Sequence, residues 1–386
     1  MTSPIRVYLD SSDFSNLSRP GQSNATPIRK IRSKLINWVR QGEIEIRYSM
    51  AHIMEAVPVD LETAELGRLR LNCIKELCGK KVFTDPITLV VQELSESRDL
   101  PLMSDRGHWF PNAETLCGVE DDVVPELPAG RYQLRRDRFF YKKYEAKLSL
   151  QDFLDENPIK KNYAIEMLAT GMTRYSMAKA INNSVSDLDF LCRWYIRNWN
   201  RSTEYSKSVR ASGAELSALL KTSNAEVKAL HMELVNKGVQ SSELQKRMAV
   251  HAKEIAEKVS QEMIEALSEG RVSPNSAISP SLESTPSMYV FSKLLAQIFL
   301  SSVIAVKNTR KARDSDLGDM LHSMYLPYVD IFRADGATES GLRNARIGAK
   351  AKIVTSLDDL VAEVEAIIAS RKLKKLYLLE SQVSDS

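Results

Sequence analysis

Three aspartates near the carboxyl terminus are spaced in a way that could bring their carboxylates together to hold a metal ion. Asp316 and Asp319 lie in a stretch whose leucines and methionines recur at helical spacing, and Asp335 follows a short apolar stretch typical of a strand. Residues three apart share one face of a helix, so we expect Asp316 and Asp319 to point together, away from the core. Such a group of acids is either a solvated helix start, favoured by the helix dipole, or a holder for a metal ion.

Another aspartate closes a predicted strand near the amino terminus. Residues 6–9 have the pattern of a strand that runs directly into Asp10. Open α/β sheets place ligand sites at the carboxyl ends of their strands, so Asp10 and Asp335 are both expected at such an edge. Glu55 lies off the apolar stripe of a predicted helix over residues 50–57, where a solvated glutamate is also the ordinary case.

The arrangement of these acids resembles that of the PIN-like nuclease family. In that family an aspartate closes the first strand, a glutamate lies on an early helix, a third aspartate opens a helix and a fourth ends the following strand. The matching positions here are Asp10, Glu55, Asp316 or Asp319, and Asp335. The spacing to Asp335 favours Asp316 as the third acid and leaves Asp319 as the alternative. The resemblance implies an α/β chain with a three-layer PIN-like fold and a small central parallel sheet.

One position departs from the family pattern. The last motif often carries Thr or Ser before its Asn or Asp, whereas this chain has Arg333, Ala334 and Asp335. Ser11 or Ser12 would then have to supply the missing hydroxyl group.

The resemblance implies a site for Mg²⁺ or Mn²⁺, because carboxylate oxygens are the ligands that these hard cations prefer. One or two such ions would polarise the scissile phosphate and help to generate the attacking hydroxide. The metal ligands and the catalytic residues are expected to be the same five acids: Asp10, Glu55, Asp316, Asp319 and Asp335. Four further residues are expected to support them from outside: Ser12, Asp13, His322 and Asp330. For His322 the alternative is a helix-surface histidine without a catalytic role.

Periodicity predicts the elements that must position these acids. Helices are expected over residues 26–40, 61–78, 86–93, 242–268 and 287–306, and strands over residues 43–48, 329–332 and 352–354. Pro327 is expected to end the acidic helix. The closing helix is expected to begin at Thr355 or Ser356 and to end near the basic residues 371–375.

The chain is expected to fold as a nuclease core with a helical insertion. Residues 1–95 and 288–386 would form the core, residues 96–272 a mostly α-helical inserted domain, and residues 273–287, rich in Ser and Pro, a linker. An apolar seam along residues 242–268 favours an intramolecular bundle. A homodimer contact or an inhibitory partner on the insertion is the alternative.

Basic residues occur together with aromatic residues at two places in the insertion, and a third basic run precedes the acidic helix. Such combinations suit a single-stranded nucleic acid, whose phosphates meet the cations while its bases stack on the rings. The alternative is a solvated basic face with buried aromatic residues behind it. The candidate contacts are Arg135, Arg136, Arg138, Lys142, Lys143, Arg193, Arg197, Arg201, Arg310, Lys311 and Arg313.

Composition narrows the class of protein. The chain has 386 residues, 43% of them hydrophobic, and a net charge of +3, so nucleic-acid binding would have to come from local basic patches. No apolar run reaches the ~20 residues of a membrane helix, and the first residues lack the apolar segment of a signal peptide. We therefore expect a soluble, cytoplasmic protein without a membrane partner. The four cysteines match neither zinc pairs nor a disulfide framework and are expected to be reduced.

The motifs of other enzyme classes are missing. The sequence has no P-loop, no dinucleotide-binding glycine pattern, no serine-hydrolase elbow and no zinc-protease motif. The leading hypothesis is a metal-dependent endonuclease, a ribonuclease on single-stranded RNA rather than DNA, with a bacterial toxin or defence effector as one setting. The alternative is a PIN-like protein that binds nucleic acid or a partner without efficient cleavage.

Overall fold

The computed structural model describes residues 3–19, 25–57, 62–94, 103–113, 143–170, 173–198, 222, 225, 229–268, 280–304 and 316–384. At the centre of these residues lies a parallel sheet of four short strands in the order β2-β1-β5-β6. The strands are β1 (Ile5–Tyr8), β2 (Ile44–Ile46), β5 (Ile331–Arg333) and β6 (Lys352–Val354). The sheet and the helices around it confirm the expected α/β class.

The strands form because β-branched and aromatic residues alternate between two buried faces. Val7 and Ile331 are register partners and belong to one hydrophobic core, whereas Tyr8 and Phe332 are partners one step further on and belong to a second core. All four side chains are at most 1% exposed. A sheet buried on both faces needs a helical layer on each of them.

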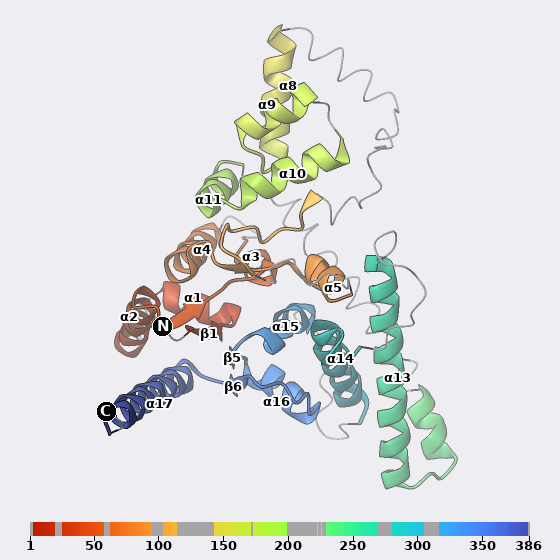
Figure 1. Ribbon diagram of the computed structural model, residues 1–386. Helices are drawn as coiled ribbons and strands as arrows, with labels where there is room; N and C mark the ends of the chain where they lie inside the picture. The colour runs from red at the N-terminus through yellow and green to blue at the C-terminus, as the bar shows by residue number, and fades with distance from the viewer. Residues whose placement is uncertain are drawn as a thin grey trace.

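Helices cover both faces of the sheet (Figure 1). The first layer contains α1 (Ser11–Ser18), α2 (Ala25–Arg40), α4 (Ala64–Cys78) and α17 (Leu357–Ser384), whose apolar side chains join the first core. The second layer contains α5 (Pro86–Leu94), α14 (Pro286–Ile304), α15 (Asp316–Ser323), η1 (Leu326–Tyr328) and α16 (Gly336–Asn344). α3 (Met50–Ala56) belongs to the first core and also contacts α15, so it lies where the two layers meet.

The strand order brings together residues that are far apart in the chain. β1 lies beside β5, while β2 and β6 extend the sheet in opposite directions from this central pair. Parallel sheets usually bind ligands at such a reversal, outside the carboxyl ends of the strands. Asp10 follows β1 and Asp335 follows β5, so both of these acids reach the same edge.

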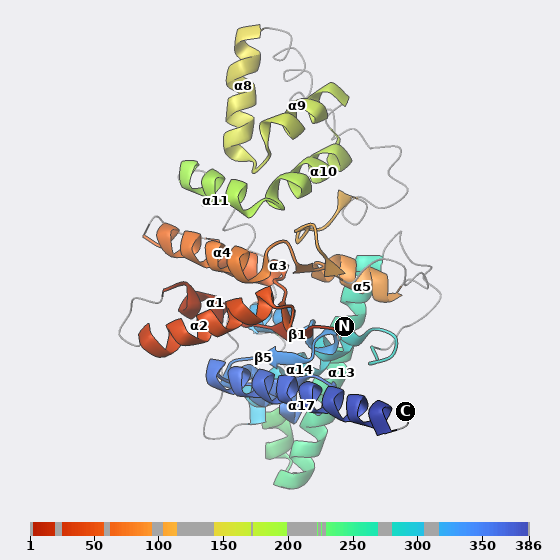
Figure 2. The ribbon, with the colours of Figure 1, turned by 60° about the vertical axis from the view of Figure 1, so that its left-hand side comes forward.

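The segment between α5 and α14 packs onto the core at two places. α8 (Lys143–Glu156), α9 (Lys161–Thr170) and α10 (Arg174–Val185) share a small core of their own, and α11 (Leu188–Arg197) joins the first core against α4. Figures 1 and 2 show these four helices stacked beyond α4, away from α14 and α17. α13 (Ser241–Ser268) lies along α14 and buries Ala252 and Ala256 in the second core. The apolar seam is therefore intramolecular, as its periodicity favoured.

Most predicted elements match the structure closely. The strand over residues 352–354 matches β6, and the helix over residues 26–40 matches α2 to within one residue. β3 (Val82–Phe83) and β4 (Met103–Ser104), which were not predicted, form a short antiparallel pair. Cys73, Cys78 and Cys192 are free thiols, as expected for these three cysteines.

Three predicted element boundaries were wrong. The acidic helix α15 ends at Ser323, before Pro327, which lies in the 3₁₀ turn η1. α17 continues to Ser384, so the basic residues 371–375 lie within the helix rather than at its end, because good helix formers follow them. Of the expected linker, residues 273–279 lie outside the described residues, and residues 286–287 already belong to α14.

Candidate active site

Asp10 opens α1 at the carboxyl end of β1. Its backbone is extended, as an N-cap residue requires, and its N–H donates to Asp13 Oδ2 at 3.0 Å. Ser12 Oγ donates to Asp10 Oδ2 at 2.5 Å. The Asp-Ser-Ser-Asp sequence therefore folds as a helix start that holds the Asp10 carboxylate at the edge of the sheet, with Ser12 and Asp13 in contact with Asp10.

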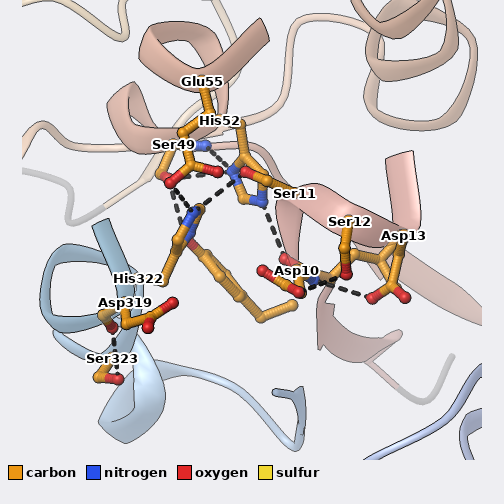
Figure 3. A network of polar contacts seen from close by, with 12 residues as sticks. Asp10, Ser11, Ser12, Asp13, Ser49, His52, Glu55, Asp319, His322 and Ser323 are labelled. Atoms are coloured by element: carbon orange, nitrogen blue, oxygen red, sulfur yellow. Dashed lines mark hydrogen bonds and ion pairs between the residues drawn. The ribbon is translucent and has the colours of Figure 1, made fainter. Parts of the chain in front are cut away.

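His322 and Glu55 form an ion pair across the site (Figure 3). His322 Nε2 lies 3.5 Å from Glu55 Oε1 and 3.1 Å from Ser11 Oγ. Burial would raise the pKa of Glu55, but hydrogen bonding to His322, the charge of His322 and Ser11 together outweigh burial and lower this pKa to about 2. Burial also works against a charged imidazole, yet Glu55 raises the pKa of His322. At 4% exposure, His322 is not the helix-surface histidine of the alternative interpretation.

A chain of polar contacts runs from His322 into the core (Figure 3). Tyr8 Oη lies 2.6 Å from His322 Nδ1 and 2.8 Å from Ser49 Oγ. The Ser49 N–H donates to His52 Nδ1 at 2.9 Å, so this nitrogen carries no proton, and His52 Nε2 donates to Leu9 O at 2.8 Å. Burial lowers the pKa of His52 to about 3, which keeps its ring neutral. The network ties β1, α3 and α15 together at the site.

Asp335 and Asp319 approach the site from the second helical layer. Asp335 caps α16, where its Oδ1 accepts a hydrogen bond from the Thr338 N–H at 2.6 Å. Burial, and then the negative charge of Asp335, raises the pKa of Asp319 to about 7, and Asp10 and Glu55 add to this rise. Figure 3 shows Asp319 and Asp10 approaching each other from different elements. Asp319 is therefore the acid that is most clearly influenced by the other three.

Asp316 lies in a different environment from the one predicted. It is the first residue of α15 and is 0% exposed, so the prediction that its side chain points away from the core is wrong. The reason is tertiary packing: α15 contacts both α3 and α14, so this short helix has more than one buried face. An amphipathic pattern alone cannot show a second buried face.

Arg333 brings a positive charge into the same site. Its Nη2 lies 3.0 Å from Asp13 Oδ1, and its Nη1 lies 3.6 Å from Asp10 Oδ2. The Asp13 side chain is 0% exposed and that of Arg333 is 11% exposed. Burial raises the pKa of Asp13 to about 7, although the charge of Arg333 acts to lower it. Arg333 had no predicted role of its own, because the departure from the family pattern lies at the next residue, Ala334.

Two other residues of the site carried no functional signal in the sequence. Tyr8 is one more apolar position of a predicted strand, and His52 is one more position of a predicted helix. Their place in the site depends on long-range contacts. Tyr8, for example, stacks on Tyr325 and Phe332 in the second core and is hydrogen-bonded to His322.

Some candidate residues lie away from the acids. Asp330 precedes β5 at the opposite end of the sheet, where it accepts a hydrogen bond from the Arg6 N–H at 2.8 Å, so the structure does not bring it to the site. Arg193 and Arg197 are exposed on α11. Trp194 between them is buried and donates its Nε1–H to a backbone carbonyl, so its ring is not available for stacking on bases.

The remaining basic candidates fall where the structure gives no side chain. Lys143 is described only by its backbone at the start of α8. The others lie outside the described residues: Arg135, Arg136, Arg138, Lys142, Arg201, Arg310, Lys311 and Arg313.

The acids match a divalent cation in donor type and in charge. Asp10, Asp319 and Asp335 offer hard oxygen atoms from three elements, and the negative charges of Asp335 and Asp10 add to burial in raising the pKa of Asp319. As the side chains stand, no group of three His, Cys, Asp or Glu residues in the described part of the chain is arranged to hold a metal ion. The carboxylates would therefore have to draw closer together around an ion.

Two general findings complete the description. Among the helices that the structure describes, none is both long and apolar enough to cross a membrane. No family model, no curated protein and no solved structure matches the chain.

Proposed function

We propose that the protein is a metal-dependent nuclease that hydrolyses phosphodiester bonds in single-stranded nucleic acid, RNA in preference to DNA, in the cytoplasm. The observation that carries this proposal is the placement of Asp10 and Asp335 after the carboxyl ends of the neighbouring strands β1 and β5, with Asp319 close enough for their charges to raise its pKa. Carboxylates gathered at a cost in stability are typical of functional sites, and a cation would offset that cost. The parallel sheet with acids after β1 and β5 also supports a PIN-like fold.

Different residues of the site would have different roles in hydrolysis. Asp10, Asp319 and Asp335 would hold Mg²⁺ or Mn²⁺, which when bound supplies positive charge to the scissile phosphate and the leaving oxygen. Glu55 raises the pKa of His322, and the ion pair between them fixes the direction of the imidazole ring. The Nε2 proton of His322 faces Glu55 and Ser11, where it would offer a hydrogen bond to a phosphate oxygen.

Helices α9 to α11 would provide part of the surface that binds the strand. Arg193 and Arg197 are exposed on α11 and would meet phosphates. A cleft of about 220 Å³ between α9 and α10 is lined by Tyr163, Tyr175 and Lys179, among others. Aromatic rings beside a cation suit an unpaired base and its phosphate, which favours a single strand over a duplex.

The test is cleavage of a labelled single-stranded RNA by the purified chain with Mn²⁺, with EDTA added in a parallel reaction. Asp10→Asn and Asp335→Asn each remove a ligand charge while keeping a good helix cap, so we expect activity to fall by orders of magnitude without loss of folding. Thermal unfolding of each variant checks that the fold is kept. A matching DNA oligonucleotide tests the preference for RNA.

Asp330→Asn is the matched control, because Asp330 lies on the same sheet at the opposite end from the acids. It should cleave at the rate of the unchanged protein. Equal cleavage by the Asp10, Asp335 and Asp330 variants would end the nuclease proposal.

A second candidate is a protein that binds nucleic acid without efficient cleavage. The observation that favours it is Arg333, which pairs with Asp10 and Asp13 and so already neutralises part of the acidic site. Under this proposal the chain binds single-stranded RNA with the usual dependence on salt, and neither Mn²⁺ nor EDTA changes the length of the RNA.

A further inference from the structure

Arg333 enters the site because of its place in the sheet. It is the last residue of β5 and pairs with Val354, one step beyond the register pair Tyr8 and Phe332. Its side chain therefore leaves the sheet beside the chain segment that carries Asp10. The guanidinium contacts both Asp10 and Asp13, at 3.6 Å and 3.0 Å.

The guanidinium is held there mainly by charge. Within the described residues, Nε and Nη1 of Arg333 are buried and donate no hydrogen bond. An arginine that serves only to pair with a carboxylate usually makes two parallel hydrogen bonds to it. Here each of the two terminal nitrogens faces a different carboxylate, so Arg333 lies between two acids as a cation would.

We infer that Arg333 occupies one of the two cation positions of the acidic site, so that the site binds a single divalent ion; this inference rests on the proposed function. Two-metal sites place two ions about 4 Å apart between shared carboxylates. The end of the site formed by Asp10 and Asp13 already holds the guanidinium. Asp319 and Asp335, together with Asp10, would then be the residues that hold the ion, while Arg333 stays paired with Asp10 and Asp13.

This assignment gives a role to the arginine at position 333, next to Ala334, where the chain departs from the family pattern. A Thr or Ser at position 333 would leave the Asp10 and Asp13 carboxylates without their cation, and Asp13 is fully buried. A buried carboxylate that loses its cation is costly unless another cation or a proton replaces it. Arginine provides a charge that is permanent and independent of the metal concentration.

The test is the number of Mn²⁺ ions bound per chain, measured by calorimetry and by electron paramagnetic resonance of free Mn²⁺. We expect one ion for the unchanged protein and for Arg333→Lys, which keeps the charge, and two ions for Arg333→Thr. Two ions bound by the unchanged protein, or one ion bound by a folded Arg333→Thr variant, would overturn the inference. The first of these outcomes requires no variant, so the inference stays testable even if Arg333→Thr does not fold.

The same measurement separates this inference from the proposed function. If the unchanged protein cleaves RNA with Mn²⁺ but binds two ions, the proposed function is supported and the proposed role of Arg333 is ruled out. If the unchanged protein neither binds Mn²⁺ nor cleaves RNA, the proposed function and the role of Arg333 are both ruled out.

Discussion

At the scale of single residues, Asp10 and Asp335 each have two roles. Both cap a helix that follows a strand, and both stand at the carboxyl edge of the sheet. The helix start fixes the backbone, and the backbone fixes where the carboxylate points. Because Asn caps a helix about as well as Asp, these positions allow the charge to be removed without removing the cap.

Asp319 and Asp316 allow a sharper prediction, because the structure separates two residues that the spacing left as alternatives. Burial and the neighbouring acids raise the pKa of Asp319 to about 7, so Asp319→Asn should raise thermal stability at pH 8 while it removes most of the activity. Asp316 is 0% exposed in the packed helix α15, so Asp316→Asn should lower stability and cost less activity per folded molecule. Cleavage rates and unfolding temperatures of both variants at pH 8 provide the measurement. The opposite order of activity loss would return the third position to Asp316, which the spacing to Asp335 favoured.

At the scale of elements, the position of α15 against α3 depends on a glycine. A Cβ atom at Gly318 would collide with Glu55 Oε1, the atom that faces His322. Glycine in a helix is unfavourable by roughly 0.5 to 1 kcal/mol relative to alanine. We interpret Gly318 as the residue that lets Glu55 lie against α15 and reach His322.

Gly318→Ala should therefore disturb the ion pair more than the fold. The better helix propensity of alanine offsets part of the collision, so we expect a small change in unfolding temperature. Glu55 would be displaced, and the pKa of His322, which Glu55 raises, should fall. Titration of the imidazole signals by NMR measures this shift, and Glu55→Gln should produce the same shift. A His322 titration that is unchanged in Gly318→Ala but moved in Glu55→Gln would show that Glu55 adapts to the added methyl group.

The elements also show what the sequence could and could not predict. α2 was predicted because its periodicity is local and it buries one simple stripe, and β6 because its apolar residues Ile353 and Val354 are adjacent. The burial of Asp316 depends in part on α3, and the contact of Arg333 with Asp10 depends on β1, and both elements lie far away in the chain. The polar contacts of Tyr8 with Ser49 and His322 join residues more than 40 positions apart. Contacts between residues so far apart in the chain cannot be predicted from the spacing of neighbouring residues.

At the scale of the whole molecule, Glu93 joins the two parts of the second layer that flank the insertion. It lies on α5 and accepts hydrogen bonds from the N–H of Ser287 at 3.0 Å and from the Ser287 hydroxyl at 2.7 Å, at the start of α14. Tyr328 Oη in η1 also donates to Glu93. Burial raises the pKa of Glu93 to about 7 despite these donors.

This shift predicts how stability depends on pH. In the unfolded chain Glu93 has its ordinary pKa of 4.5, so between pH 4.5 and about 7 the unfolded state releases a proton that the folded state keeps. The contribution of Glu93 to stability is therefore fully present below pH 4.5 and is lost as the pH rises to about 7. Asp13 and Asp319, with pKa values of about 7, act in the same direction. Glu55, with a pKa of about 2, acts in the opposite direction, but only below its ordinary value of 4.5.

Glu93→Gln should flatten this dependence, because glutamine resembles the protonated carboxyl group and cannot ionise. Each pKa unit corresponds to about 1.4 kcal/mol, so Glu93 should account for a few kcal/mol of the stability lost between pH 4.5 and 8. Urea unfolding without metal at pH 5 and at pH 8 measures the loss for each protein. Glu283→Gln, at an exposed position shortly before α14, is the matched control and should keep the original dependence. If the Glu93 and Glu283 variants lose the same stability between the two pH values, Glu93 is ionised at little cost, and the contacts with Ser287 and Tyr328 must offset its burial.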